Sequence, residues 1–149
     1  MERSTIRFIV VEDFAPFRQF ICKTMAKWPH LQIICEVSDG AEAVQKATEL
    51  KPDLILLDIG LPTLNGIEAA RQIRQLAPES KVIFLTAESS PEIVQEALNL
   101  GARGYVLKKM AARDLLAAVE AVLEGRQFVS DGLSGHNFTD SSPRLPADD

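Results

Sequence analysis

Acidic, hydroxyl and amino side chains directly follow four short apolar runs of this sequence. Glu12 and Asp13 follow IRFIVV, Asp58 follows LILL, Thr86 follows VIFL, and Lys108 follows YVL. The carboxyl ends of parallel strands meet at one edge of a sheet, where open α/β sheets bind their ligands. If the runs are such strands, three acids, one hydroxyl and one ammonium share that edge. A single acid after a strand is usually a solvated loop residue, but the set together points to chemistry.

That set of side chains suits phosphoryl transfer. Neighbouring carboxylates raise one another's pKa unless a cation is present, and Mg²⁺ prefers hard oxygen ligands of this kind. Mg²⁺ typically takes one or two carboxylates together with waters and a phosphate oxygen. One carboxylate then stays free to attack phosphorus and form an aspartyl phosphate. Lys108 and the metal would neutralise the charge on the phosphoryl oxygens as they move.

The elements that must hold these residues follow a regular alternation. Short apolar runs alternate five times with segments of helical periodicity. We expect strands at about Arg7–Val11, Gln32–Val37, Asp53–Leu57, Lys81–Leu85 and Gly104–Leu107. We expect helices at about Ala15–Lys27, Ala41–Leu50, Gly66–Leu76, from Pro91 to just before Gly101, and at Ala112–Glu124. Right-handed crossovers between parallel strands place helices on both faces of the sheet. The unbroken apolar run in the third strand predicts a central position, covered on both sides.

Length and composition limit the function classes. The 149 residues, 46% hydrophobic and 25% charged, suit one globular domain. The net charge of −5 disfavours nonspecific attraction to nucleic acid or anionic membranes. No apolar run reaches the roughly 18 residues of a membrane span, and the first residues do not resemble a signal peptide. Cys22 and Cys35 match no metal or disulfide pattern, so we expect buried free thiols and a cytoplasmic protein.

Four segments together carry a family resemblance. They are IRFIVVEDF, PDLILLDIGLPTLNGIE, VIFLTA and GARGYVLKK, and they resemble the response-regulator receiver domain of two-component signalling in order and spacing. The match runs from about Ile6 to Gly125. It implies an α/β, flavodoxin-like (βα)5 doubly wound sheet with five parallel strands in the order 2-1-3-4-5. We therefore expect a receiver domain at residues 1–125, followed by a polar tail or linker at 126–149.

The resemblance also assigns roles at the metal site. It implies that Asp58 is the phospho-acceptor. Glu12 and Asp13 would hold Mg²⁺ together with Asp58 and the backbone carbonyl of Gly60. The phosphoryl group would come from a sensor histidine kinase or a phosphotransfer protein. Such a domain catalyses only its own phosphorylation and dephosphorylation and is no conventional enzyme.

A second group of residues would carry the switch. The resemblance implies that Thr86 is the hydroxyl that approaches the phosphoryl group, that Lys108 is the pairing ammonium, and that Tyr105 is the aromatic whose rotamer reports activation. The signal would emerge on the surface of the fourth helix, fifth strand and fifth helix. A homodimer through receiver surfaces is left open. Phe14, Phe17, Arg18 and Ile21, beside the acidic pair, fit either a partner-facing surface or core packing.

Two positions depart from the family pattern. Lys109 follows Lys108 where the family often has Pro, and non-proline cis bonds are costly, so a cis bond there is left open. Leu61 stands where Met is frequent, a volume-conserving change that we expect to be silent. We expect Gly66 to serve a tight loop or a close approach of backbone to backbone rather than chemistry.

The last part of the sequence indicates how the receiver would pass its signal on. The stretch AAVEAVLEGRQFVS resembles the end of receivers that precede a LuxR-type helix-turn-helix domain. Beyond it the sequence is polar, too short for that domain, and expected to be flexible except where Phe128 and Val129 pack back. The chain itself is thus not expected to bind DNA, and would regulate transcription through an output domain it lacks. A stand-alone receiver that acts by protein contact is the alternative.

Two other functions compete with the receiver. Acid-dependent phosphohydrolases also form an aspartyl phosphate, but they resemble a D-x-D motif, and Gly60 occupies the place of the second acid. A receiver-like binding module that is never phosphorylated is disfavoured by the complete set of site residues. Failure to bind Mg²⁺ would favour that module.

Overall fold

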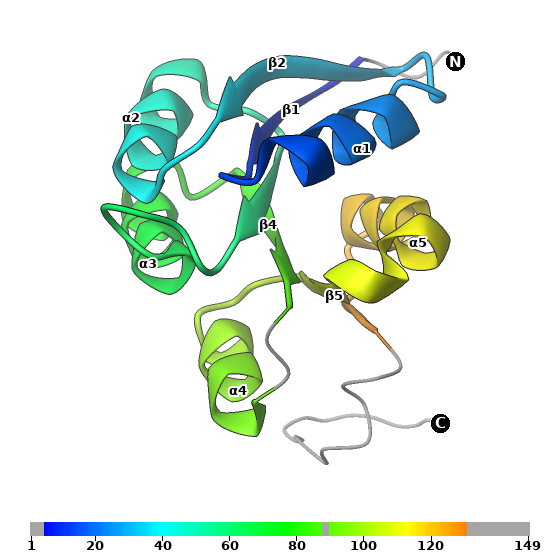
Figure 1. Cartoon of the computed structure of the whole chain (residues 1–149). Coiled ribbons are helices and arrows are strands. Elements are labelled where there is room, and N and C mark those ends of the chain that lie inside the picture. Colours follow the sequence, from blue (N-terminus) through cyan, green and yellow to red (C-terminus); the bar gives the residue numbers. More distant parts are fainter. Residues whose placement is uncertain (1–4, 88–89, 131–149) are drawn as a thin grey trace.

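The computed structural model describes residues 5–87 and 90–130, which form one parallel sheet with helices on both faces (Figure 1). The strands are β1 (Ile6–Val11), β2 (Leu31–Val37), β3 (Leu54–Asp58), β4 (Lys81–Thr86), β5 (Gly104–Leu107) and β6 (Phe128–Val129). The helices are α1 (Ala15–Met25), α2 (Gly40–Leu50), α3 (Gly66–Leu76), α4 (Pro91–Asn99) and α5 (Ala111–Leu123). A 3₁₀ turn, Lys108–Met110, leads into α5.

The sheet has the order β2-β1-β3-β4-β5-β6, with every neighbouring pair parallel. The predicted order of the first five strands is confirmed. The predicted number of five is wrong, because β6 pairs with β5 in the described part of the chain. The Phe128 amide donates to the Arg103 carbonyl at 2.9 Å, and the Ser130 amide donates to the Tyr105 carbonyl at 3.0 Å. These are backbone bonds, which a side-chain pattern of two residues does not reveal.

The two faces of the sheet carry different helices. In Figure 1, α1 and α5 lie on one face and α2, α3 and α4 on the other. Along β1, Phe8 and Val10 belong to the core beneath α1 and α5, whereas Ile9 and Val11 belong to the other core. All five residues of β3 are buried, which confirms its predicted central position. The carboxyl ends of β1 and β3, where the acids lie, therefore belong to a sheet that helices cover on both faces.

Side chains cap the first turns of α2 and α3. Asp39 accepts a hydrogen bond from the Glu42 amide at 2.8 Å at the start of α2. Asn65 does the same for the Glu68 amide at 2.9 Å at the start of α3. Such caps satisfy amides that have no partner within the helix. Asn65 ends the loop that follows Asp58, so this cap fixes where that loop passes into α3.

Three further predictions concern parts of the molecule outside the site. Residues 126–130 lie against the sheet, whereas 131–149 are outside the described residues, so the boundary at residue 125 stays a prediction. Cys22 and Cys35 are free, as predicted, but each is only partly buried. Burial, with a smaller contribution from Glu36, raises the pKa of Cys22 to about 11. Among the described residues, no helix is long and apolar enough to cross a membrane.

Candidate functional site

The register of the sheet brings the predicted residues to one edge. Val11 at the end of β1 is level with Leu57, so Glu12 and Asp58 come next on neighbouring strands. Thr86 at the end of β4 is level with Leu107 on β5. Lys108 then follows at the start of the 3₁₀ turn. The strands that carry the acids, β1 and β3, flank the point where the strand order reverses, which is the usual ligand site of such sheets.

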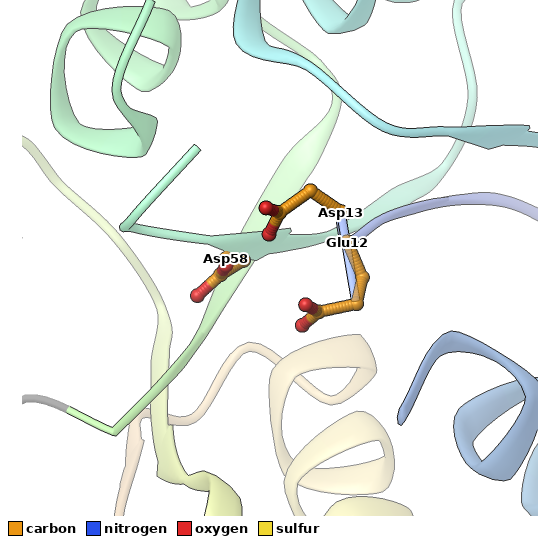
Figure 2. Close-up of side chains that lie close together, drawn as sticks. All are labelled: Glu12, Asp13 and Asp58. Carbon is orange, nitrogen blue, oxygen red and sulfur yellow. The ribbon is translucent and has the colours of Figure 1, made fainter. Parts of the chain in front are cut away.

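Three carboxylates converge at this edge. Figure 2 shows the side chains of Glu12 and Asp13 from the end of β1 facing Asp58 from the end of β3. One oxygen from each carboxylate lies within 4.8 Å of the others. Glu12 is completely buried, Asp58 is nearly so, and Asp13 is exposed. Mg²⁺ holds its oxygen ligands at about 2.1 Å in an octahedron, so opposite ligands lie about 4 Å apart. The spacing and the hard oxygen donors therefore fit Mg²⁺ with a small adjustment.

Lys108 supplies the positive charge of the site. Its Nζ lies 2.8 Å from Glu12 Oε1 and 3.4 Å from Asp58 Oδ1. Although burial disfavours the ammonium, the two carboxylates outweigh it and raise the pKa of Lys108. Lys108 is thus charged at neutral pH. One ammonium against three carboxylates leaves the cluster with excess negative charge, which favours a divalent cation.

The surroundings of Asp58 raise its pKa, and a bound cation would lower it again. Burial raises the pKa of Asp58, repulsion from Glu12 raises it further, and Lys108 and the Gly60 amide offset only part of the rise. Glu12 Oε1 is buried, and its partner among the described residues is the Lys108 ammonium at 2.8 Å. A cation would lower the pKa of Asp58 and offset the repulsion from Glu12, so the raised pKa fits a metal site.

The loop after β1 is braced by a residue whose role the sequence did not reveal. Arg18 on α1 donates from Nη1 to the Glu12 carbonyl at 2.7 Å. Its Nε lies 3.3 Å from Glu36 Oε1 on β2. The Phe14 amide also donates to Glu12 Oε2 at 3.0 Å. Glu12 is therefore oriented through both its backbone and its side chain, and only the fold brings Glu36 to Arg18.

The other residues near the acidic pair divide between core and surface. Ile21 is completely buried, as expected for core packing. Phe14 is 61% exposed. Phe17 lies partly buried against the core beneath α1, with its ring under the Lys108 ammonium. The sequence left core and surface open for this group, and the structure assigns each residue separately.

The loop after Asp58 is tight because α3 begins against it. A Cβ on Gly66 would lie 2.1 Å from the Asp58 carbonyl oxygen. The Gly66 amide donates to the Ile59 carbonyl at 2.7 Å. The expected close approach of backbone to backbone at this glycine is therefore confirmed. Gly60, by contrast, lies exposed in the loop with open space around its Cβ position.

The two predicted switch residues lie on neighbouring strands. Thr86 is buried at the end of β4, and Tyr105 is completely buried in β5. The Tyr105 ring lies 6.0 Å from the Phe84 ring, tilted by 53°. Tyr105 thus points into the core shared with α4 in this structure. The described residues contain no cis peptide bond, so the bond between Lys108 and Lys109 is trans.

Comparison with known proteins agrees with this geometry. Residues 8–120 match the model of the response regulator receiver domain. Transcriptional regulatory protein DegU of Brevibacillus brevis is 32% identical over 100% of this chain and 63% of its own length. Transcriptional regulatory protein LnrK of Bacillus subtilis is 36% identical over 80% of this chain and 54% of its own. The chain therefore spans little more than half the length of these relatives.

Solved structures show the same fold. A two-component response regulator of the LuxR family from Aurantimonas superimposes with a TM-score of 0.84 and 31% identity, covering 89% of this chain and 95% of that one. The receiver domain of the putative response regulator NarL from Mycobacterium tuberculosis gives a TM-score of 0.78 at 28% identity, covering 83% of this chain and 100% of that one.

Proposed function

The chain belongs to the response regulator receiver domain family, and on that premise we propose that it accepts a phosphoryl group on Asp58. The observation that carries this assignment is the convergence of Asp58, Glu12, Asp13 and Lys108 at one edge of the sheet. Asp58 lies within reach of the Lys108 ammonium, at 3.4 Å, and beside two further acids that could hold a cation. A carboxylate in such surroundings can attack phosphorus while positive charge nearby stabilises the phosphoryl oxygens.

The transfer is a displacement at phosphorus. An Asp58 oxygen forms a bond to phosphorus while the bond from phosphorus to the donor's imidazole nitrogen breaks. The electron pair of that bond stays on the imidazole, which takes up a proton from water. Lys108 stabilises the charge on the phosphoryl oxygens from its side of the site. Glu12, Asp13, Asp58 and the Gly60 carbonyl would hold Mg²⁺, which would neutralise further negative charge on those oxygens.

The switch follows from the placement of Thr86 and Tyr105. Phosphorylation adds negative charge and acceptor oxygens next to the end of β4. The Thr86 hydroxyl moves to donate to a phosphoryl oxygen, and the space it leaves lets Tyr105 change rotamer. Tyr105 lies in β5 between α4 and α5, so the surface of α4, β5 and α5 changes with it. A local charge event then biases a two-state surface.

The partners and the output follow from the family and from the length of the relatives. A sensor histidine kinase or a phosphotransfer protein donates the phosphoryl group. DegU and LnrK are named as transcriptional regulatory proteins, and this chain spans 63% and 54% of them. We assign residues 1–130 to the receiver, because β6 and the buried Ser130 pack on its sheet, and 131–149 to a linker toward a DNA-binding output domain. The receiver turns over no metabolite and catalyses only its own phosphorylation and dephosphorylation.

Intact-protein mass spectrometry tests the assignment of Asp58. The protein is incubated with acetyl phosphate or with a phosphorylated histidine donor, each with and without Mg²⁺. We expect a Mg²⁺-dependent gain of one phosphoryl group that Asp58→Asn abolishes. Asp53→Asn is the matched control, because Asp53 is an exposed acid just before the opposite end of β3. An equal gain by Asp58→Asn, or no gain from either donor, would contradict the proposal, and the latter would favour an unphosphorylated binding module.

A further inference from the structure

An aromatic ring forms the third side of the Lys108 environment. The ammonium lies 5.1 Å from the centroid of the Phe17 ring, within the range of a cation–π interaction. Its other two neighbours are the carboxylates of Glu12 at 2.8 Å and Asp58 at 3.4 Å. The negative face of the ring attracts the ammonium without hydrogen bonding it. Lys108 is thus positioned by two acids and one neutral π surface.

The ring itself is held in place from two directions. Phe17 packs on the core between the sheet and the helices α1 and α5. Its ring also stacks on that of Phe20 on the same helix, with centroids 5.6 Å apart. The Phe17 ring is therefore packed against the core on one side, whereas the lysine side chain has several rotatable bonds. We expect the ring to limit the positions that the ammonium can take.

The three neighbours of Lys108 differ in what a metal does to them. Glu12 and Asp58 belong to the carboxylate cluster that fits a divalent cation. A cation bound there would contact the carboxylate oxygens of Glu12 and Asp58 and would repel the ammonium. The Phe17 ring offers no oxygen to the metal, so its attraction for the ammonium remains. Phe17 is the neighbour that Lys108 keeps when both carboxylates serve the metal.

We propose that Phe17 is a positioning residue, whose ring holds the Lys108 ammonium at the site while the carboxylates are engaged by the cation. This role rests on the phosphoryl transfer proposed above. A leucine at this position would fill a similar part of the core but would lack the negative ring face. Tyr would retain that face.

The first test compares phosphorylation rates from acetyl phosphate at saturating Mg²⁺. We expect Phe17→Leu to lower the rate about three- to tenfold and Phe17→Tyr to keep it within about twofold. Phe128→Leu is the matched control, since Phe128 is a partly buried ring on the same core but lies beside Gly104, at the opposite end of β5 from Lys108. In a Lys108→Met background, Phe17→Leu should have no further effect. Equal rates for wild type and Phe17→Leu, or equal losses for Phe17→Leu and Phe128→Leu, would overturn the proposal.

The second test needs no phosphorylation, so it separates this proposal from the assignment of Asp58. Protons of the Lys108 side chain close to a ring face resonate upfield, which nuclear magnetic resonance detects in the metal-free protein. We expect the upfield shift in wild type and Phe17→Tyr, and its loss in Phe17→Leu. The shift should persist when the wild type is titrated to saturation with Mg²⁺. Loss of the shift on adding Mg²⁺ would refute the role of the ring even if Asp58 is phosphorylated.

Discussion

Replacing Ser130 by alanine tests how the sixth strand is attached. Ser130 is completely buried directly after β6. Its hydroxyl donates to Asp114 Oδ2 on α5 at 2.9 Å and accepts from the Leu107 amide on β5 at 3.1 Å. One side chain therefore joins the end of β6 to both α5 and the residue before Lys108. Ser130→Ala removes both hydrogen bonds and adds no bulk.

The expected loss in the free energy of unfolding follows from the polar groups that lose their partner in Ser130→Ala. The Leu107 amide loses the acceptor that Ser130 provides, and an unsatisfied buried donor costs about 1–3 kcal/mol. Asp114 keeps Arg113, whose Nε lies 2.7 Å from Oδ1, so the loss at the carboxylate is about 1 kcal/mol. We expect the free energy of unfolding to fall by about 2–4 kcal/mol, from a total of about 5–15 kcal/mol. At about 3 °C per kcal/mol for a domain of this size, Tm falls by about 6–12 °C.

Urea and thermal unfolding followed by circular dichroism measure this change. Ser38→Ala is the control, because Ser38 is exposed and its removal should stay within about 0.5 kcal/mol. Hydrogen exchange at the Leu107 amide gives a local readout, and it should accelerate in Ser130→Ala alone. If Ser130→Ala destabilised the protein no more than the control, the hydroxyl would not be satisfying buried groups, and the reasoning would be wrong.

Four further substitutions probe the site. Burial and repulsion raise the folded-state pKa of Asp58, so its carboxyl favours folding at low pH and this contribution is lost as pH rises through that pKa. Asp58→Asn should therefore raise Tm of the metal-free protein at pH 7 and remove the rise that Mg²⁺ causes in wild type; a lower Tm would contradict this. Gly66→Ala, whose Cβ would lie 2.1 Å from the Asp58 carbonyl, should cost about 3 kcal/mol or more in urea unfolding, whereas Gly60→Ala has open space and should cost less than about 1 kcal/mol. Arg18→Ala frees the Glu12 carbonyl and should weaken Mg²⁺ binding roughly tenfold by calorimetry, with unchanged affinity as the refuting result.

Local patterns were sufficient to predict most of the fold. The alternation of apolar runs and helical periodicity predicted the first five strands and the five helices to within a few residues, because each element carries its own period. The unbroken run Leu54–Leu57 marked the buried central strand. The acids after β1 and β3 were found because polar residues that end apolar strands must share one edge of a parallel sheet. The close approach at Gly66 was also readable from its type and place.

Tertiary structure decided what depends on contacts between distant residues. β6 is joined to β5 by backbone hydrogen bonds and to α5 through Ser130, and neither leaves a pattern in a strand of two residues. Arg18 binds the Glu12 carbonyl with one nitrogen and pairs with Glu36 through another, and the second contact exists because the fold brings β2 to α1. Phe17 reads as an ordinary apolar helix residue until the fold places Lys108 over its ring. Sequence periodicity reports which face of an element is buried, whereas these contacts depend on which elements become neighbours in the folded chain.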